Sequence, residues 1–472
     1  MIYFVFFISF LIRLIAINQS LWLDEAITAK VMKTFDFLAI IQKFSPFDFH
    51  PPLYYLLIKF WTNIFGYSEI SLRFPSIIFS LLTGFVVYKI GDLLVDKKFG
   101  FWATVFFLFN PLIVYYSQEA RMYMMTTFFV ILSFYFFIKT QKKLQSQNSP
   151  SDSEGKIQNL IFENNFLLMN LFLILSFFTF YGSIFFILAI LFYFLFKKQY
   201  KYLILITFYL ILVFLIVSPL LYEQWVNSKV SLVEVKNWSL VLGKANIKNL
   251  LLIPIKFSVG RISFYPKLVY WLLADSFSFF VFYVLFKNLN IKNSLKIKNL
   301  ELKIVLFYFF GFPIFLGFIA SFFIPLLQYF RFLYLVPLMC LLLVDRTYKS
   351  YKAYMILTTG FLFWSLLYLF IPQFHREDWK GLAYYLKKNK INEVYMIPSS
   401  SDALGYYNNQ IKIKSLKQLR DRVIVLNSKK VFVIPYSSEI FGIDYKSYLN
   451  NKSVSLEKKA FHELMLEIYT IN

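Results

Sequence analysis

Two short polar stretches of the sequence contain side chains that could carry out acid–base chemistry. Asp24 and Glu25 lie in "WLDEA", directly after the first apolar run, and Glu119 and Arg121 lie in "SQEARMY", between two later apolar runs. A carboxylate can accept the proton of a hydroxyl nucleophile, and a cation can stabilise a departing anion. We therefore predict Asp24, Glu25 and Glu119 as catalytic residues, with Asp24 or Glu25 as the general base.

Further side chains could bind an anionic or polar substrate near these acids. They share a cationic or hydroxyl group and lie at or near the predicted ends of apolar runs: His50, Arg73, Arg121, Tyr123 and Arg331. A buried cation next to a departing phosphate would lower the barrier to its release. We predict these five residues as substrate-binding.

The composition indicates which class of protein must position these residues. Of 472 residues, 59% are hydrophobic and 22% aromatic, and the mean hydropathy is +0.60. A soluble domain is closer to half apolar, so the excess indicates an α-helical multi-pass membrane protein. The net charge of +23 would suggest nucleic acid in a soluble protein, but here the lysines lie between apolar runs. That pattern indicates cytoplasmic loops near anionic lipids and no nucleic-acid partner.

Apolar runs of membrane-spanning length recur and predict about eleven helical spans. They are expected near 2–17, 74–94, 99–116, 122–139, 162–180, 183–197, 202–221, 268–286, 303–323, 332–345 and 353–371. Five lysine-bearing loops fall on one side of the membrane if the N-terminus is cytoplasmic. The outer side then receives 18–73, the turn 117–121 and everything after 372. We predict a cell (plasma or inner) membrane protein whose candidate residues face outward.

The segments between and after the spans have three different characters. The loop 18–73 has amphipathic spacing, which predicts helices on the membrane surface, one of them starting at Pro51 and Pro52. The Ser-, Asn- and Gln-rich segment 140–160 is typical of a flexible cytoplasmic linker. After a transmembrane domain at 1–372, the tail 373–472 predicts a small extracytoplasmic α/β domain. In it, "DWKGLAYYLKKN" and "DYKSYLNN" indicate helices, and "EVYMIP" and "KVFVIPY" indicate strands.

The candidate residues also have interpretations without chemistry. Asp24 and Glu25 could cap a surface helix, because acids favour helix N-termini. Glu119 and Arg121 could form a neutralising pair at the end of a span. The other cations could anchor spans at the interface by extending their charge to the headgroups. The placement of both acidic stretches at one membrane depth favours a functional site.

A site at that depth suits a substrate with a lipid tail and a polar head. If the head is a sugar phosphate, transfer needs a base for the acceptor hydroxyl, a cation or metal for the departing phosphate, and in-line geometry. A transporter of lipid-linked sugars is the alternative, and it would place polar residues near the bilayer midplane. A scaffold whose outer tail binds a partner is a third interpretation, in which Asp24 and Glu119 would be replaceable.

Several stretches together resemble the GT-C membrane glycosyltransferases. They are "WLDEA", "HPPLYYLLIKFW", "SLRFPSIIFSLLTG", "NPLIVYYSQEARMY" and "QYFRFLYLVPLMCLLL", and the tail begins with "HREDWKGLAYYLKKN". The pattern is most similar to the bacterial branch related to protein O-mannosyltransferases and lipid A aminoarabinose transferases (glycosyltransferase family 39-like). The similarity is strongest over 20–130. It implies an inverting transferase of the cell envelope that uses a polyprenyl-phosphate sugar at the outer face.

The resemblance also implies roles for individual residues. Asp24 matches the catalytic aspartate of the first outer loop, Glu25 its acidic neighbour, and Glu119 the second acidic motif. His50 matches the His or Lys before the Pro-Pro pair, but Phe49 stands where aminoarabinose transferases have an acid. That departure weakens the case for a metal site, although a divalent cation could still take part. The acceptor stays open among lipids, polysaccharides and proteins.

Overall fold

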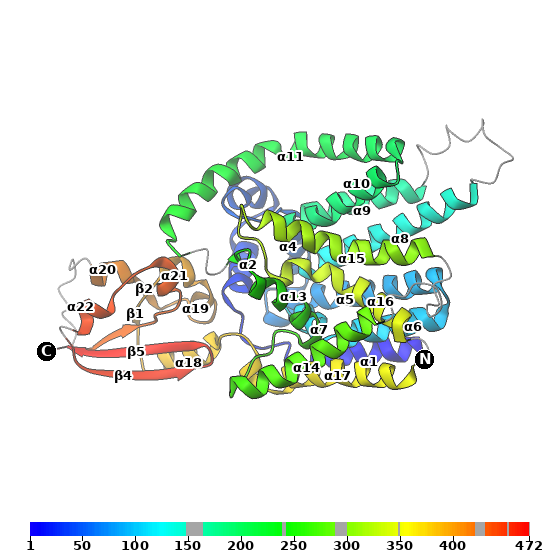
Figure 1. The fold of residues 1–472 in the computed structure, drawn as a ribbon. Helices are drawn as coiled ribbons and strands as arrows, with labels where there is room; N and C mark the ends of the chain where they lie inside the picture. Colours follow the sequence, from blue (N-terminus) through cyan, green and yellow to red (C-terminus); the bar gives the residue numbers. More distant parts are fainter. Residues whose placement is uncertain are drawn as a thin grey trace.

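The computed structural model describes residues 1–147, 164–237, 242–287, 300–347, 350–420, 430–450 and 453–471. A bundle of long helices forms most of the molecule, and a smaller α/β part lies at one end of it (Figure 1). The N-terminus lies at the opposite end of the bundle from the α/β part (Figure 1). The apolar helical bundle and the α/β part therefore meet at one end of the bundle.

A helix is present at each of the expected apolar runs. In chain order these are α1 (Ile2–Leu14), α5 (Glu69–Leu94), α6 (Lys97–Phe109) with α7 (Pro111–Ser117), α8 (Tyr123–Gln147), α9 (Asn164–Thr179), α10 (Ile184–Phe196), α11 (Tyr200–Glu234), α14 (Lys267–Phe286), α15 (Leu300–Ala320), α16 (Val336–Thr347) and α17 (Tyr351–Phe370). Within the described residues, six helices are long and apolar enough to cross a membrane, or seven if the bent pair α6 and α7 is one span. The remaining helices are shorter, so the expected total of about eleven stays a prediction.

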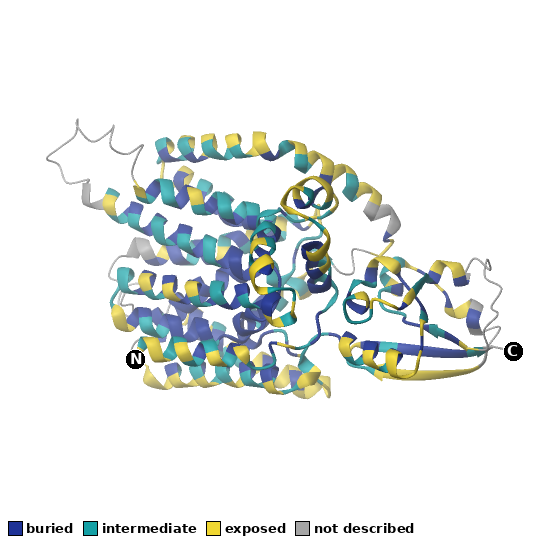
Figure 2. Cartoon of the chain, turned by 180° about the vertical axis from the view of Figure 1, so that it is seen from behind, coloured by how far each residue is buried: buried dark blue, intermediate teal, exposed yellow. Residues whose placement is uncertain are grey.

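The bundle is apolar on the outside as well as in the core. Exposed large hydrophobic side chains are frequent along α11, for example Phe208, Phe214 and Ile216. Figure 2 shows exposed residues on the outer helices and buried residues between them. Since water would disfavour such a surface, the outer helices are suited to lipid. The chain is therefore a membrane-embedded protein.

A buried charge inside the bundle is satisfied by neutral partners. Arg13 of α1 donates to the Ser80 hydroxyl of α5 and to the carbonyl of Leu108 in α6, each at 2.9 Å. A buried cation without such partners would be very costly. Arg13 thus ties α1 to its two neighbours near the end of the helix.

The first loop contains helices, as expected, and their position on the membrane surface stays a prediction. They are α2 (Leu23–Thr34), the short turns α3 (Phe37–Ala39), η1 (Ile40–Phe44) and η2 (Ser45–Phe47), and α4 (Leu53–Phe65). Pro52 precedes the first residue of α4, as its fixed φ favours, and Gly66 ends that helix with a φ of 78°. The side chain of Ser68 then caps α5 by accepting from the Ser71 amide. The loop is therefore compact and helical.

The C-terminal part is a sheet with flanking helices. Its five described strands are β1 (Glu393–Met396), β2 (Lys412–Ser415), β3 (Lys430–Val433), β4 (Ser453–Phe461) and β5 (Leu464–Ile471), in the order β2-β1-β3-β5-β4. β1 pairs in parallel with β2 and β3, whereas β5 pairs antiparallel with β3 and β4. The helices include α18 (Trp379–Lys388), α19 (Asp402–Tyr407), α20 (Leu416–Arg420), α21 (Ser438–Phe441) and α22 (Lys446–Asn450). The predicted strands β1 and β3 and the predicted helices α18 and α22 are confirmed.

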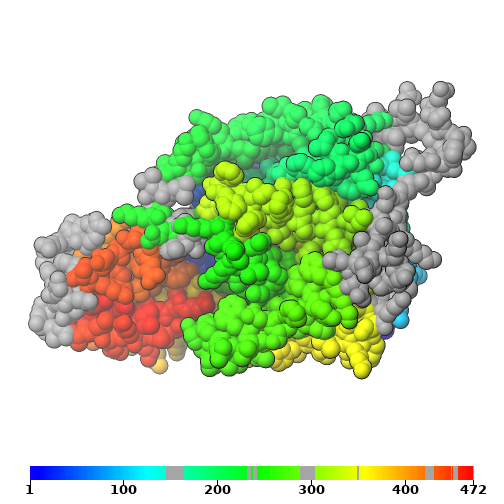
Figure 3. Space-filling model, in the orientation of Figure 1, coloured from blue at the N-terminus to red at the C-terminus, as the bar shows by residue number. Residues whose placement is uncertain are grey.

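The α/β part contacts the first loop and the segment just after α11. Figure 3 shows it packed against one end of the bundle. The Tyr407 hydroxyl accepts from the Leu21 amide at 2.8 Å, and Lys30 of α2 pairs with Asp402 at 2.7 Å. Asn237, just after α11, bonds to the carbonyls of Glu439 and Ile440. The predicted linker at 140–160 lies mostly outside the described residues, but its first residues continue α8 as far as Gln147.

Candidate active site

The first turn of α2 places two neighbouring acids in different surroundings. Trp22 is extended, and α2 begins at Leu23, so Asp24 and Glu25 both lie in the first turn, where the helix dipole favours negative charge. The Asp24 side chain is 34% exposed, and its Oδ2 atom lies 3.6 Å from the Arg121 guanidinium. Asp24 is thus accessible, with a cation close by.

Glu25 is fully occupied by partners. Its carboxylate accepts two bonds from Arg73 of α5, at 2.9 and 2.6 Å, and a third from the Ala120 amide at 2.7 Å. Both side chains of the pair are only 1% exposed. Arg73 also donates to the carbonyls of Ile17, Gln19 and Ser20. The pair therefore joins α2, α5, the chain before α2 and the turn after α7.

Glu119 lies in that turn, close enough to Asp24 for the two charges to interact. Its carbonyl accepts from the Ser76 hydroxyl at 2.6 Å, and its Oε2 atom accepts from Arg376 at 3.3 Å. Burial, and then the negative charge of Glu25, raise the pKa of Glu119 to about 8. The carboxyl group is 4% exposed, so a change in its charge acts at short range on its neighbours.

Arg121 connects the two acidic stretches to the segment before α4. Its guanidinium donates to the Tyr55 hydroxyl at 3.3 Å and faces Asp24, and within the described chain its Nε atom has no hydrogen-bond partner although it is buried. The Asp48 carboxylate also acts on Arg121. A buried guanidinium with an unused donor is suited to binding an additional anion.

His50 and Asp48 form a pair beside this cation. The His50 Nδ1 atom lies 3.1 Å from Asp48 Oδ1, and the His50 ring stacks near Phe180. Burial opposes ionisation of Asp48, yet the charges of His50 and Arg121 lower its pKa below the usual value. Gln224 of α11 donates to the His50 carbonyl at 3.3 Å, which fixes the segment. Over the described ranges, no group of three or more His, Cys, Asp or Glu side chains could hold a metal ion.

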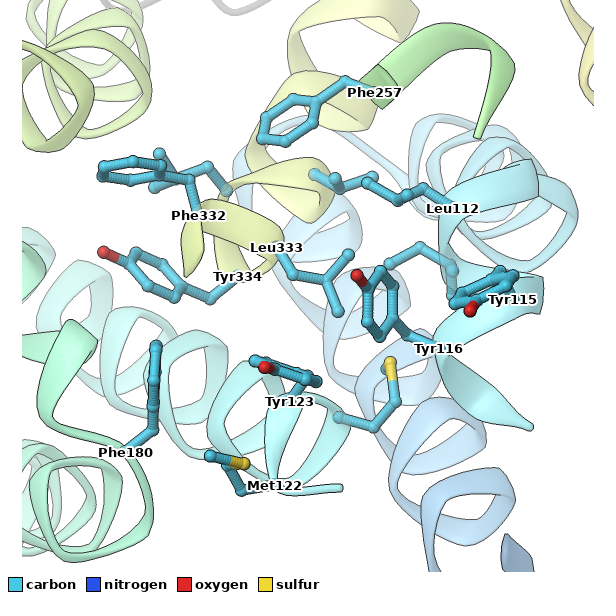
Figure 4. Close-up of a cluster of buried hydrophobic side chains, with 14 of the residues drawn as sticks. Leu112, Tyr115, Tyr116, Met122, Tyr123, Phe180, Phe257, Phe332, Leu333 and Tyr334 are labelled. Carbon is cyan, nitrogen blue, oxygen red and sulfur yellow. The ribbon is translucent and has the colours of Figure 1, made fainter. Parts of the chain in front are cut away.

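Tyr123, at the start of α8, lies among aromatic rings and interacts electrostatically with Arg331. Tyr123 contacts Tyr116, Phe180 and Phe330 in edge-on geometry, and Figure 4 shows it between Tyr116 and Phe180. The charges of Arg121, Glu119 and Asp24 act on the Tyr123 hydroxyl. Arg331 lies in η5 (Tyr329–Leu335), and its buried Nη1 atom has no partner among the described residues.

Two further arginines at the site were not predicted from the sequence. Arg376 contacts Glu119, and Arg261 donates to the hydroxyl of Tyr115 in α7. Arg261 follows Gly260, whose φ of 73° ends α13 (Ile247–Val259), and its charge acts on Glu119. The only sequence signal for Arg376 was the motif "HREDWKGLAYYLKKN", and Arg261 had none because a lone arginine in a polar loop has no periodicity.

Comparisons with known proteins identify the fold. A sequence profile described as dolichyl-phosphate-mannose-protein mannosyltransferase matches residues 49–149. The structure is similar to ArnT from Cupriavidus metallidurans in the apo state, with a TM-score of 0.57 and 10% sequence identity, over 99% of this chain and 97% of that chain. ArnT bound to undecaprenyl phosphate gives a TM-score of 0.55 at 10% identity, over 99% and 96%.

An archaeal oligosaccharyltransferase has a similar structure. AglB from Archaeoglobus fulgidus, in complex with an inhibitory peptide and a dolichol-phosphate, gives a TM-score of 0.50 at 12% identity, over 96% of this chain and 72% of that chain. No curated protein matches the sequence significantly. Together, the structural matches and the profile show that this chain has the GT-C fold of membrane glycosyltransferases, with a multi-pass helical bundle and a C-terminal sheet domain. The resemblance predicted from the motifs is confirmed.

Proposed function

We propose that this protein is an inverting glycosyltransferase that moves a sugar from a polyprenyl-phosphate donor to an acceptor hydroxyl, with Asp24 as the general base. One observation carries the proposal: Asp24 is a partly exposed carboxylate directly beside the buried cation Arg121, in a chain with the GT-C fold. ArnT binds undecaprenyl phosphate and AglB binds a dolichol-phosphate, which supports a lipid-phosphate donor here.

In the proposed step, the acceptor oxygen attacks the anomeric carbon of the donor sugar from the side opposite the phosphate. The carbon–oxygen bond to the phosphate breaks as the new bond forms, so the configuration inverts and polyprenyl phosphate leaves with the electron pair. Asp24 takes the acceptor proton, which raises the nucleophilicity of the oxygen at the moment of attack. The attack requires the donor to be held in line, within contact distance.

The cations and hydroxyls around Asp24 bind the substrates in this proposal. Arg121 has an unused buried donor, and we assign it to the leaving phosphate. His50, Arg331 and Tyr123, which other elements bring near Arg121, bind the phosphate or the sugar in this proposal. Glu119 orients substrate hydroxyls. Because Arg73 binds Glu25 through two hydrogen bonds and the Ala120 amide adds a third, we propose that Glu25 and Arg73 act by fixing α2, so that Asp24 keeps its position.

We further propose that the site faces the outside of a plasma or inner membrane. The lysine-rich loops favour a cytoplasmic N-terminus, and the N-terminus lies at the far end of the bundle from the α/β part (Figure 1). The transmembrane domain at 1–372 and the domain at 373–472 would then meet at the outer surface. The acceptor is a lipid, a polysaccharide or a protein that carries a free hydroxyl.

The proposal is tested with purified wild type and Asp24→Asn protein and a panel of radiolabelled polyprenyl-phosphate sugars. Release of free polyprenyl phosphate is followed with and without EDTA. We expect wild type to turn over one or more donors and the folded variant to be inactive. Equal turnover by both proteins would remove Asp24 as the base. Movement of intact donor across liposomes without release would favour the transporter instead.

A further inference from the structure

Arg376 is an unusual point of contact between the C-terminal part and the bundle. It lies in the short segment between η6 (Pro372–Phe374) and α18, and its side chain is 13% exposed. Its Nη2 atom donates to Glu119 Oε2 at 3.3 Å. The guanidinium lies over the Trp22 ring, 3.8 Å from its centroid, and 5.6 Å from the centroid of Tyr115. Arg376 thus touches both acidic stretches of the site.

The atoms around this contact have unused hydrogen-bonding capacity. Among the described residues, Glu119 Oε1, Arg376 Nε and Trp22 Nε1 are buried and have no hydrogen-bond partner. Buried polar atoms are normally paired, so these three atoms can take a water molecule or a polar group of a substrate as a partner. An acceptor and two donors close together suit a hydroxyl, which can donate to one and accept from another.

The segment that carries Arg376 is held firmly from both sides. Asp378 caps α18 by accepting from the Gly381 amide at 2.8 Å, and the Asp378 amide donates to the His462 carbonyl in the turn between β4 and β5. The neighbouring Glu377 accepts from the Tyr436 hydroxyl at 3.1 Å. The position of Arg376 therefore depends on the sheet of the C-terminal part.

We infer that the C-terminal domain completes the active site through Arg376, a positioning residue that holds Glu119 Oε2 so that Oε1 faces a substrate hydroxyl. The inference deepens the proposed function and rests on it. The hydrogen bond from Arg376 fixes one carboxyl oxygen of Glu119 in either protonation state and leaves the other oxygen for the substrate, while the guanidinium stacks on Trp22 directly before the first turn of α2. The C-terminal domain is then required for turnover itself, in addition to any role in acceptor binding.

The test uses the full-length protein and the donor assay described above. Arg376→Gln removes the charge, and Arg376→Lys keeps the charge but loses the planar fork that spans Glu119 and Trp22. Lys380→Gln is the matched control, because Lys380, in the first turn of α18 directly after that segment, pairs with Glu69 at 3.2 Å and no bond between Lys380 and Glu119 is present. Glu119→Gln and the double variant Glu119→Gln with Arg376→Gln complete a double-mutant cycle, which measures the coupling between the two residues. Gel filtration and thermal unfolding verify that each variant is folded.

We expect Arg376→Gln to lower kcat about 10²-fold with little change in the donor KM, since misplacing a reacting group costs about that much. Arg376→Lys should recover part of the loss, Lys380→Gln should behave as wild type, and the double variant should be no slower than Glu119→Gln. The inference would be overturned if the effects of Glu119→Gln and Arg376→Gln on kcat were fully additive, or if Arg376→Gln changed thermal stability without changing kcat. The proposed function would stand in both cases. Turnover unaffected by Asp24→Asn would overturn the proposed function, and this inference with it.

Discussion

Asp24 and Glu25 are adjacent in the sequence, yet the structure gives them opposite surroundings. Glu25 is 1% exposed and accepts three hydrogen bonds from Arg73 and the Ala120 amide. Asp24 is 34% exposed and has one cation at 3.6 Å. A saturated, buried ion pair fixes geometry, whereas an accessible carboxylate next to a cation can exchange protons with a substrate. Two neighbouring acids of one motif can therefore have different roles: Glu25 is suited to fixing the geometry of the site, and Asp24 is suited to exchanging a proton with a substrate.

The largest effect is expected at Asp24. Asp24→Asn keeps the size and the place in α2 but removes the base, so turnover should fall about 10³-fold, within the usual contribution of general base catalysis. The thermal unfolding midpoint should change little, because Asp24 is partly exposed. Asp24→Glu serves as the control, since it keeps a carboxylate at a changed distance and should retain intermediate activity.

Glu25→Gln should lower the stability of the fold more than the turnover, which is the reverse of the result expected for Asp24→Asn. Removing one partner of a buried ion pair leaves Arg73 uncompensated, which costs about 3–5 kcal/mol in the free energy of unfolding. The midpoint in a thermal unfolding scan should therefore drop clearly, and the yield of folded protein with it. Turnover per folded molecule should stay well above that of Asp24→Asn. A stable but inactive Glu25→Gln protein would contradict the assignment of Glu25 to positioning.

Arg121 should be sensitive to the loss of its planar group even when its positive charge is kept. In Arg121→Lys the contacts to Tyr55 and Asp24 cannot both be kept by a single ammonium. We expect turnover to fall about 10-fold to 10²-fold, as for removal of one electrostatic donor from an active site. Steady-state kinetics with the identified donor measure this loss, and an unchanged kcat would separate Arg121 from the leaving phosphate.

The pKa of Glu119 predicts how stability depends on pH. Burial and the charge of Glu25 raise this pKa to about 8, above its value in the unfolded chain. The unfolded state therefore ionises first, and the stability associated with neutral Glu119 is lost as the pH rises from about 5 to 8. Wild type should lose more thermal stability across this range than Glu119→Gln does. If the unfolding midpoints of the two proteins changed equally with pH, Glu119 would already be ionised in the folded protein over this range.

The smallest effect is expected at the exposed end of α2. Lys30 pairs with Asp402 of α19, but its side chain is 61% exposed. Such pairs contribute less than about 1 kcal/mol, so Lys30→Ala should leave the unfolding midpoint and turnover nearly unchanged. This variant shows whether α2 as a whole is sensitive to substitution. A large loss of activity would mean that docking of the C-terminal part on α2 matters beyond Arg376.

Much of the bundle could be predicted from the sequence, because long apolar runs have few alternatives to a buried or lipid-facing helix. The start of α4 directly after Pro52 and the acidic first turn of α2 agree with local rules on proline and acidic residues. The β4–β5 hairpin was missed: the charged "LEKK" within β4 hides the alternation expected of a strand.

The pairings within the site were beyond prediction from the sequence. Glu25 and Arg73 are 48 residues apart, and Glu119 and Arg376 are 257 apart. Such contacts depend on how helices pack, and no local pattern encodes them. The sequence therefore indicated acids that the structure brings close together, but it did not show that Glu25 accepts three hydrogen bonds. Nor did it show that the C-terminal part contributes an arginine.

A comparison of Asp24→Asn and Glu25→Gln in one donor-turnover assay tests whether Asp24 acts as the base and Glu25 fixes the geometry. Activity is expressed per folded molecule. Gel filtration in detergent gives the folded fraction of each preparation. We predict that Asp24→Asn is folded and nearly inactive. Glu25→Gln should give less folded protein, but the folded molecules should be active. Equal activity of Asp24→Asn and wild type, or an inactive folded fraction of Glu25→Gln, would contradict the division of roles between the two acids.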